Sequence, residues 1–144
     1  MSSSQKVIIV TGASQGIGAG VVDGFRALGH KVVATSRSIQ PSTDPDILTV
    51  AGDIADPATA ERVVGEAVAR FGRIDTLVNN AGIFVAKPFT RYTKEDYAQI
   101  VATNMSGFFY ISQLAIAQME KNGSGHVVSA VSYTHLRAHE TRGN

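Results

Sequence analysis

A glycine-rich turn near the N-terminus constrains the fold of this chain more than any other feature. Residues 11–18 read TGASQGIG, and they lie between a short apolar run at residues 7–10 and a segment at residues 17–28 whose apolar residues have helical spacing. A strand, a glycine-rich turn and a helix in this order are typical of the first unit of a parallel α/β sheet. The position of the glycines, more than their number, therefore predicts the fold.

Each glycine of this turn has a physical role in such a unit. Gly12 permits a tight turn, Gly16 lets backbone approach a pyrophosphate where a Cβ would collide, and Gly18 lets the helix pack against the sheet. Bound phosphates would face the unpaired N–H groups at the helix N-terminus. An ordinary glycine-rich loop is the alternative, so the turn predicts a dinucleotide site only together with its context.

The rest of the chain alternates between short apolar runs and helical segments. The runs are nearly continuous and β-branched, as in strands buried on both faces of a parallel sheet. Helices are expected at residues 17–28, 58–71 and 94–119, the last segment forming two helices. We predict an α/β fold, a Rossmann-type doubly wound parallel sheet with helices on both faces, in strand order 3-2-1-4-5 and truncated after about the fifth strand. The five expected strands are residues 7–10, 32–34, 47–50, 74–78 and 126–128.

The last residues of the chain break this alternation. Residues 133–144 contain a single large aliphatic residue and have no face that could join a core. We expect them to be disordered or loosely helical, and foreign to the domain. The predicted organisation is one incomplete dinucleotide-binding domain over residues 1–132, followed by this tail.

Composition excludes several classes of function. With 13 basic and 12 acidic residues the chain has too little net charge to favour nucleic acid or a membrane surface, and without cysteine it has no disulfide or thiolate chemistry. The apolar run at residues 7–10 is too short for a signal segment or a membrane span. His135 and His139 are four residues apart, but a zinc site of that type needs a glutamate between them and a third ligand, so no metal is predicted. We expect a cytoplasmic protein whose partner is a small molecule.

Four motifs, taken in order, resemble those of the short-chain dehydrogenase/reductase family. The glycine spacing is similar to the family's T-G-x-x-x-G-x-G, and residues 79–82 match its N-N-A-G. Asp53 and Ile54 stand where the family has an aspartate that contacts the adenine amino group, and Asn104 resembles the asparagine that kinks a helix at the active site. The resemblance covers residues 6–132, the N-terminal part of a family member. It implies hydride transfer between a nicotinamide cofactor and a carbonyl or secondary alcohol.

Structural roles are the alternatives for these residues. Asp53 can act as a turn or capping residue, and Asn104 can be a polar residue tolerated within a helix. The resemblance gives residues 79–82 a largely supporting role beneath the cofactor. The order of the motifs along the chain favours the functional interpretation.

The end of the second expected strand predicts which nicotinamide cofactor is bound. The family has an acidic residue there that binds the adenosine ribose and repels a 2′-phosphate, whereas residues 34–38 of this chain read ATSRS. The Arg37 guanidinium can bind a phosphate through several donors, and the hydroxyls of Ser36 and Ser38 can add to them. We predict that NADP(H) is preferred. NAD(H), with Arg37 as a solvated surface residue, is the alternative.

The resemblance also implies a catalytic serine. It selects Ser132, with Ser129 as the less favoured alternative, and it puts the family's Y-x-x-x-K beyond Asn144. We therefore expect an NAD(P)(H)-dependent oxidoreductase whose chain is not catalytically complete; the alternative is a non-catalytic dinucleotide-binding module or sensor. The residues expected to contact the cofactor are Gly12, Ser14, Gln15, Gly16, Ile17, Gly18, Ser36, Arg37, Ser38, Asp53, Ile54, Asn80, Ala81 and Gly82, and the expected catalytic residues are Ser132 and Asn104.

Two further expectations concern surfaces. The family commonly dimerises through the long helix, so the full-length form is expected to be a homo-oligomer. In a chain that stops here the fifth strand becomes a sheet edge, and one face of residues 105–119 lacks its apolar contacts. We expect poor solubility or aggregation of the isolated chain.

Overall fold

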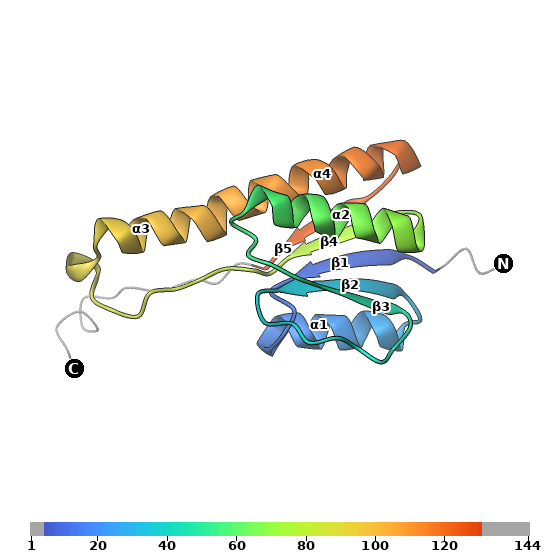
Figure 1. Cartoon of the computed structure of the whole chain (residues 1–144), viewed down its shortest axis with the longest axis horizontal. Coiled ribbons are helices and arrows are strands. Elements are labelled where there is room, and N and C mark those ends of the chain that lie inside the picture. The colour runs from blue at the N-terminus through green and yellow to red at the C-terminus, as the bar shows by residue number, and fades with distance from the viewer. Residues whose placement is uncertain (1–4, 131–144) are drawn as a thin grey trace.

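Five parallel strands form the centre of the structure, a computed structural model that describes residues 5–130. They lie in the order β3-β2-β1-β4-β5, and their carboxyl ends meet at one edge of the sheet (Figure 1). The predicted α/β class and strand order are confirmed. The strands are β1 (Val7–Thr11), β2 (Lys31–Ser36), β3 (Ile47–Ala51), β4 (Thr76–Asn79) and β5 (His126–Ser129).

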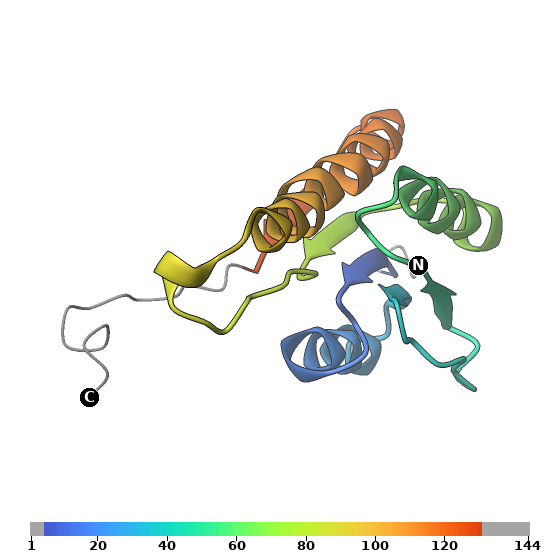
Figure 2. The ribbon, with the colours of Figure 1, turned by 60° about the vertical axis from the view of Figure 1, so that its left-hand side comes forward.

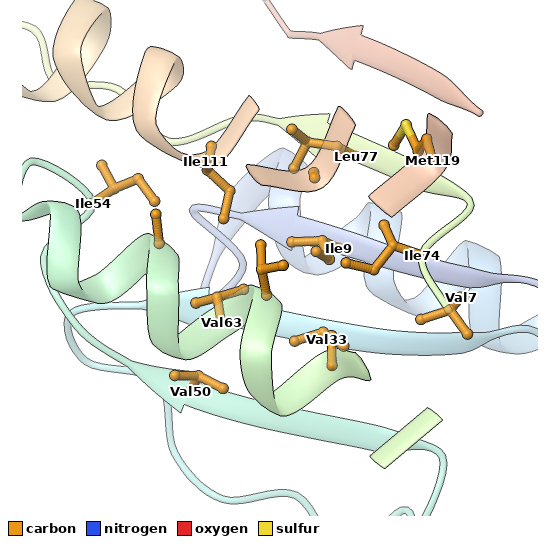
Figure 3. Packing of buried hydrophobic residues seen from close by; sticks show 14 residues of the cluster. Val7, Ile9, Val33, Val50, Ile54, Val63, Ile74, Leu77, Ile111 and Met119 are labelled. Atoms are coloured by element: carbon orange, nitrogen blue, oxygen red, sulfur yellow. The ribbon is translucent and has the colours of Figure 1, made fainter. Parts of the chain in front are cut away.

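Helices cover both faces of this sheet. Helix α1 (Gly16–Ala27) lies on one face, and α2 (Pro57–Phe71) and α4 (Gly107–Asn122) lie on the other, as the two views agree (Figures 1 and 2). Strand β1 is buried on both sides, because Ile8 packs in the core cluster beneath α1 and Ile9 packs in the cluster beneath α2 and α4 (Figure 3). This two-sided burial is the reason that β1 is a continuous apolar run instead of an alternating one, whereas β5, which the sequence also predicted to be buried on both faces, is exposed at all four residues.

Capping residues set the helix ends. The Asp56 carboxylate accepts a hydrogen bond from the N–H of Ala58 at 2.9 Å, and Pro57 occupies the first position of α2, where its missing N–H costs nothing. Helix α2 ends at Gly72, with φ of +83°, and α1 is followed by Gly29, with φ of +86°. Glycine adopts these left-handed conformations without strain.

A continuous helical run of 29 residues, Lys94–Asn122, forms the longest element. It comprises α3 (Lys94–Ile100), a π-helical turn η2 (Val101–Ser106) and α4. The two helices expected here are present, and a π-helical turn joins them. By length and composition this run could cross a membrane, with a mean hydropathy of 1.3 over its most apolar window. That is weak support for a membrane, since core helices of globular proteins have the same character, and Ile111, Ala115 and Met119 are buried in the core.

The far edge of the sheet exposes apolar surface. Strand β5 pairs only with β4 among the described residues, and Val128 is 51% exposed. The other face of the long helix carries Met105, Phe108, Phe109 and Ile116, all of them exposed. The apolar exposure expected at this edge and helix face is therefore present.

A short 3-10 helix, η1 (Phe89–Arg91), lies in the connection between β4 and α3.

Candidate functional site

Two adjoining cavities lie at the carboxyl edge of the sheet. One, of about 440 Å³, follows the ends of β1, β2 and β3, and the other, of about 530 Å³, follows the ends of β4 and β5. They share Thr11, Ile54, Asn80 and Thr103 among other residues, so they form one continuous hollow. A crevice beyond the carboxyl ends of the strands is where open α/β sheets bind ligands.

The structure brings the residues expected to bind the cofactor together in this hollow. All of them except Gly18 line the 440 Å³ cavity, and Asn104 lines the 530 Å³ cavity. Ser129, the alternative catalytic serine, lines the 530 Å³ cavity as well. Ser132 and the tail that the sequence analysis separated lie outside the described residues. The cavity residues that sequence reasoning predicted are Gly12, Ser14, Gln15, Gly16, Ile17, Ser36, Arg37, Ser38, Asp53, Ile54, Asn80, Ala81 and Gly82.

The glycines of the first turn are needed for two different reasons. Gly12 and Gly16 have φ of +62° and +59°, a region that L side chains rarely adopt. A Cβ on Gly12 would also lie 2.9 Å from Ala81 Cα, whereas a Cβ on Gly16 would meet nothing within 4 Å. A Cβ on Gly18 would lie 2.0 Å from the Gly12 carbonyl oxygen. Gly18 therefore allows the helix to approach the glycine-rich turn, whereas the sequence predicted that it would allow contact with the sheet.

The beginning of α1 is suited to an anion. Gln15 is the N-cap residue with φ of −158°, and its side chain makes no capping hydrogen bond within the described part of the chain. The first turn of this helix contains no acidic residue. Unpaired N–H groups and the positive end of the helix dipole therefore face the cavity side of the turn, where a phosphate would be stabilised.

Thr11 joins the two turns that form the floor of the hollow. Its hydroxyl accepts hydrogen bonds from the N–H groups of Asn80, at 3.0 Å, and Ala81, at 2.9 Å. The Asn80 side chain in turn donates to the Gly12 carbonyl at 3.1 Å. Sequence reasoning gave residues 79–82 a supporting role and did not single out Thr11. The sequence did contain a signal for the role of Thr11, because threonine is the first residue of the motif T-G-x-x-x-G-x-G.

Asn104 holds the segment that follows β4. Its side-chain oxygen accepts from the N–H of Ile83 at 2.8 Å, and its side-chain nitrogen donates to the Ile83 carbonyl at 3.0 Å. The residue lies within the π-helical turn η2, so the helix is irregular where the family resemblance implied a kink. Both polar atoms of this side chain are engaged in holding the cavity wall.

The end of β2 carries polar groups without protein partners. Thr35 Oγ1 and Ser36 Oγ are buried and have no hydrogen-bond partner among the described residues. Arg37 and Ser38 follow at the cavity surface, and Arg37 forms no ion pair within residues 5–130. Buried hydroxyls are satisfied in the great majority of cases, so these two indicate a place for a polar ligand or water.

Asp53 and Ile54 form the turn between β3 and α2. The Asp53 carboxylate accepts from the N–H of Ala55 at 3.0 Å, which is the turn role that the sequence analysis left open for it. Asp53 also lines the cavity, so its structural role does not remove it from the site. Ile54 is 8% exposed and borders both cavities.

A set of side-chain contacts anchors the segment between Ile83 and α3. The Lys87 ammonium lies 2.6 Å from the Asp96 carboxylate and holds the pKa of that carboxyl below its usual range, and a backbone hydrogen bond from Thr93 lowers it further. Thr93 and Asp96 form a capping box at the start of α3. The Tyr92 hydroxyl donates to the Val85 carbonyl at 2.8 Å. Within residues 5–130, no group of three metal-binding side chains is present.

Comparison with known proteins agrees with the motifs. The family model described as short chain dehydrogenase matches residues 6–141, a range that extends into the segment which the sequence analysis set apart. The 3-oxoacyl-(acyl-carrier-protein) reductase of Escherichia coli is 34% identical over 135 residues, covering 90% of this chain and 55% of that protein. Acetoacetyl-CoA reductase of an Acinetobacter species is 32% identical, covering 94% and 59%. The chain thus spans little more than half the length of these relatives.

Solved structures give the same result. A short-chain dehydrogenase from Streptomyces avermitilis superposes with a TM-score of 0.82 at 32% identity, over 90% of this chain and 50% of that one. The 3-ketoacyl-(acyl-carrier-protein) reductase from Brucella melitensis, solved in complex with NADH, has a TM-score of 0.83 at 30% identity, over 88% and 57%. The sequence comparisons and the structural comparisons therefore identify the same group of related proteins.

Proposed function

This chain belongs to the short chain dehydrogenase family, and we propose that it carries the cofactor-binding part of an NADP(H)-dependent carbonyl reductase or alcohol dehydrogenase. When bound, the nicotinamide would supply a hydride acceptor or donor for a carbonyl and secondary alcohol pair. The residues of this chain bind and orient that cofactor. The substrate is a small carbonyl compound or alcohol, and the relatives include a 3-oxoacyl-(acyl-carrier-protein) reductase and an acetoacetyl-CoA reductase.

The main observation behind this proposal is that the hollow formed by the two cavities lies beside the N-terminus of α1, where the Gln15 side chain makes no capping hydrogen bond within the described residues. The pyrophosphate fits at the glycine-rich turn, where Gly16 leaves open space and α1 presents its N–H groups. The adenosine then lies toward Asp53 and the end of β2. The nicotinamide lies toward the 530 Å³ cavity, next to Asn104 and Ser129.

The preference for NADP(H) rests on the end of β2. A 2′-phosphate at this point would find the Arg37 guanidinium and the hydroxyls of Ser36 and Ser38, with no carboxylate in residues 34–38 to repel it. The unpartnered Ser36 hydroxyl supports a polar ligand at this place. NAD(H) remains the alternative cofactor, and the Brucella relative was solved with NADH.

Catalysis itself needs groups beyond this set. We propose Ser132 as the residue that orients the substrate oxygen, with Ser129 as the alternative, and Asn104 as the residue that shapes the site beside it. The 144 residues contain no Y-x-x-x-K, the pair that would donate a proton to the developing alkoxide. We propose that these 144 residues bind a dinucleotide, and a non-catalytic module or sensor is the second candidate function. A cytoplasmic location and a homo-oligomeric full-length form belong to the same proposal.

Side-by-side affinities for NADPH and NADH test the proposal. In calorimetric titrations the wild-type chain is expected to bind NADPH more tightly than NADH. Arg37→Ala is expected to lower NADPH affinity on the order of tenfold, the loss of one charge-assisted phosphate contact, and to leave NADH affinity unchanged. Arg91→Ala, at an exposed arginine of η1 that lines neither cavity, is the matched control. Tighter NADH binding, or no loss for NADPH in Arg37→Ala, would refute the preference.

Activity separates the two candidate functions. A longer form of the chain that includes a Y-x-x-x-K should oxidise or reduce a small alcohol or carbonyl compound with NADP(H). Binding of dinucleotide by that form without turnover of any such substrate would favour the module or sensor. Absence of dinucleotide binding by the 144-residue chain would reject both.

A further inference from the structure

Gly107, the first residue of α4, makes an unusually close contact with the turn between β3 and α2. It is buried, and a Cβ on this residue would lie 2.8 Å from Ile54 Cγ2, 3.0 Å from the Ile54 carbonyl oxygen and 3.2 Å from the Ile54 carbonyl carbon. The contact involves backbone as well as side chain. It therefore cannot be relieved by a rotamer change of Ile54 alone.

The turn on one side of this contact is fixed. The Asp53 carboxylate accepts from the N–H of Ala55 at 3.0 Å, and the N–H of Asp56 donates to the Asp53 carbonyl at 3.0 Å. Asp56 in turn caps α2. Ile54 itself belongs to the core cluster that includes Ile111 of α4 and lies at the end of that cluster in Figure 3. A shift of this turn would have to move the start of α2 with it.

The helix on the other side is fixed as well. Ser112 of α4 accepts a buried hydrogen bond from the Asn79 side chain at 3.0 Å, and Ile111 is fully buried. On the N-terminal side of Gly107, Asn104 is bound to Ile83 through both of its side-chain polar atoms. The first residue of α4 therefore lies between two anchored points.

We propose that Gly107 is a positioning residue for the adenosine end of the cofactor site. Gly107 lines neither cavity, so it acts through Ile54. Because Gly107 has no side chain, the turn of Asp53 and Ile54 can pack closely against α4, and this packing sets the position of the Asp53 carboxylate at the cavity wall. A methyl group at this position pushes the turn outward by several tenths of an ångström and misplaces the Asp53 carboxylate. This inference rests on the proposed dinucleotide binding.

Two dinucleotides that differ only in the base test it. NADPH carries an adenine amino group that can donate to Asp53, and its hypoxanthine analogue carries a carbonyl oxygen there instead. The wild-type chain is expected to prefer NADPH. Gly107→Ala is expected to lower NADPH affinity on the order of tenfold and to change affinity for the analogue little, so that the preference is lost. Gly65→Ala in α2, where a Cβ meets nothing within 4 Å, is the matched control and should keep the preference.

The outcomes separate this inference from the proposed function. If the wild-type chain binds neither dinucleotide, the proposed function fails. If it binds both, and Gly107→Ala weakens both equally or weakens neither, the positioning role is overturned, because a general loss of structure does not select one base.

A second pair of variants applies if Gly107→Ala does not fold. Ile54→Leu removes the Cγ2 methyl nearest to Gly107 at nearly constant volume, and the double variant Gly107→Ala/Ile54→Leu keeps only the contacts to the carbonyl group. A smaller preference for NADPH in the double variant than in Ile54→Leu supports the positioning role. An equal preference in the two overturns it.

Discussion

The side-chain amide of Asn80 donates a hydrogen bond to the backbone carbonyl of Gly12 across 3.1 Å, and so ties the turn after β4 to the glycine-rich turn after β1. The two residues are 68 positions apart in the sequence. Together with the Thr11 hydroxyl, this bond makes the two turns one unit. The cofactor site is therefore built on a floor whose shape depends on both turns at once.

Thr11→Val should be destabilising. The Thr11 side chain is buried, and its replacement leaves the N–H groups of Asn80 and Ala81 without their acceptor. We expect a loss of about 1–3 kcal/mol in the free energy of unfolding, measured by urea denaturation. Thr35→Val is the matched control, because Thr35 Oγ1 is equally buried and has no protein partner among the described residues to lose. Equal losses in the two variants would contradict this account.

Gly18→Ala should prevent the turn from forming as it does here. The added Cβ would lie 2.0 Å from the Gly12 carbonyl oxygen, and backbone must move to accept it. We expect a large fall in the midpoint of thermal unfolding together with loss of dinucleotide binding. Gly20→Ala, two residues further along α1 with open space around the site of its Cβ, should be neutral or slightly stabilising. A Gly18→Ala chain as stable as Gly20→Ala would show that the turn relaxes easily.

Ser112→Ala should loosen the attachment of α4 to the sheet. The hydroxyl of Ser112 accepts from the Asn79 side chain in a buried environment, and its removal leaves that amide without this partner. We expect a loss of about 1–2 kcal/mol in the free energy of unfolding, measured by chemical denaturation. The exposed Ser124→Ala is the control and should have no measurable effect. An equal loss of unfolding free energy in Ser112→Ala and Ser124→Ala would mean that the hydrogen bond between Asn79 and Ser112 makes no net contribution to stability.

Acid should weaken the anchor at the start of α3. The Lys87 ammonium holds the pKa of the Asp96 carboxyl below its usual range, so the folded pKa is lower than the unfolded one of about 3.9. The contribution of this carboxylate is therefore complete above about pH 4 and is lost as the pH falls through the folded pKa. Unfolding curves from pH 7 to pH 2 should show wild type more stable than Asp96→Asn at neutral pH and the two converging in acid.

A partner variant checks the origin of that pH dependence. Lys87→Met removes the ammonium, so at neutral pH the stability difference between Lys87→Met and the double variant Lys87→Met/Asp96→Asn should be smaller than the difference between wild type and Asp96→Asn. A stability difference between wild type and Asp96→Asn that stays constant down to pH 2 would exclude the Asp96 carboxylate as its source.

The exposed apolar face of α4 should drive self-association of the isolated chain. Phe109 is 54% exposed and Ile116 is 41% exposed on the same helix, and Val127 and Val128 of β5 are exposed at the sheet edge. We expect sedimentation velocity to detect species larger than a monomer. The double variant Phe109→Lys/Ile116→Lys, with neither residue lining a cavity, should shift the distribution toward monomer. A monodisperse wild-type monomer would contradict the expectation.

The sequence predicted the elements of the fold because each leaves a local pattern. Burial on both faces makes β1 a continuous apolar run, and positive φ angles require glycine at Gly12 and Gly16. The alternation of strands and helices then restricts the sheet to a few common orders, and the observed order is one of them. The π-helical turn η2 was not predicted, because its residues have the same apolar spacing as a regular helix.

Which atoms meet across the site was decided by the tertiary structure alone. Nothing near Gly107 in the sequence shows that its missing side chain faces Ile54, and nothing near Asn104 shows that it binds both polar atoms of the Ile83 backbone. Local sequence specifies backbone angles and which residues are buried, since both depend on neighbours along the chain. The distance between residues that are 21 or 53 positions apart depends instead on how whole helices pack against the sheet, and the packing of large surfaces leaves no signature in any one segment.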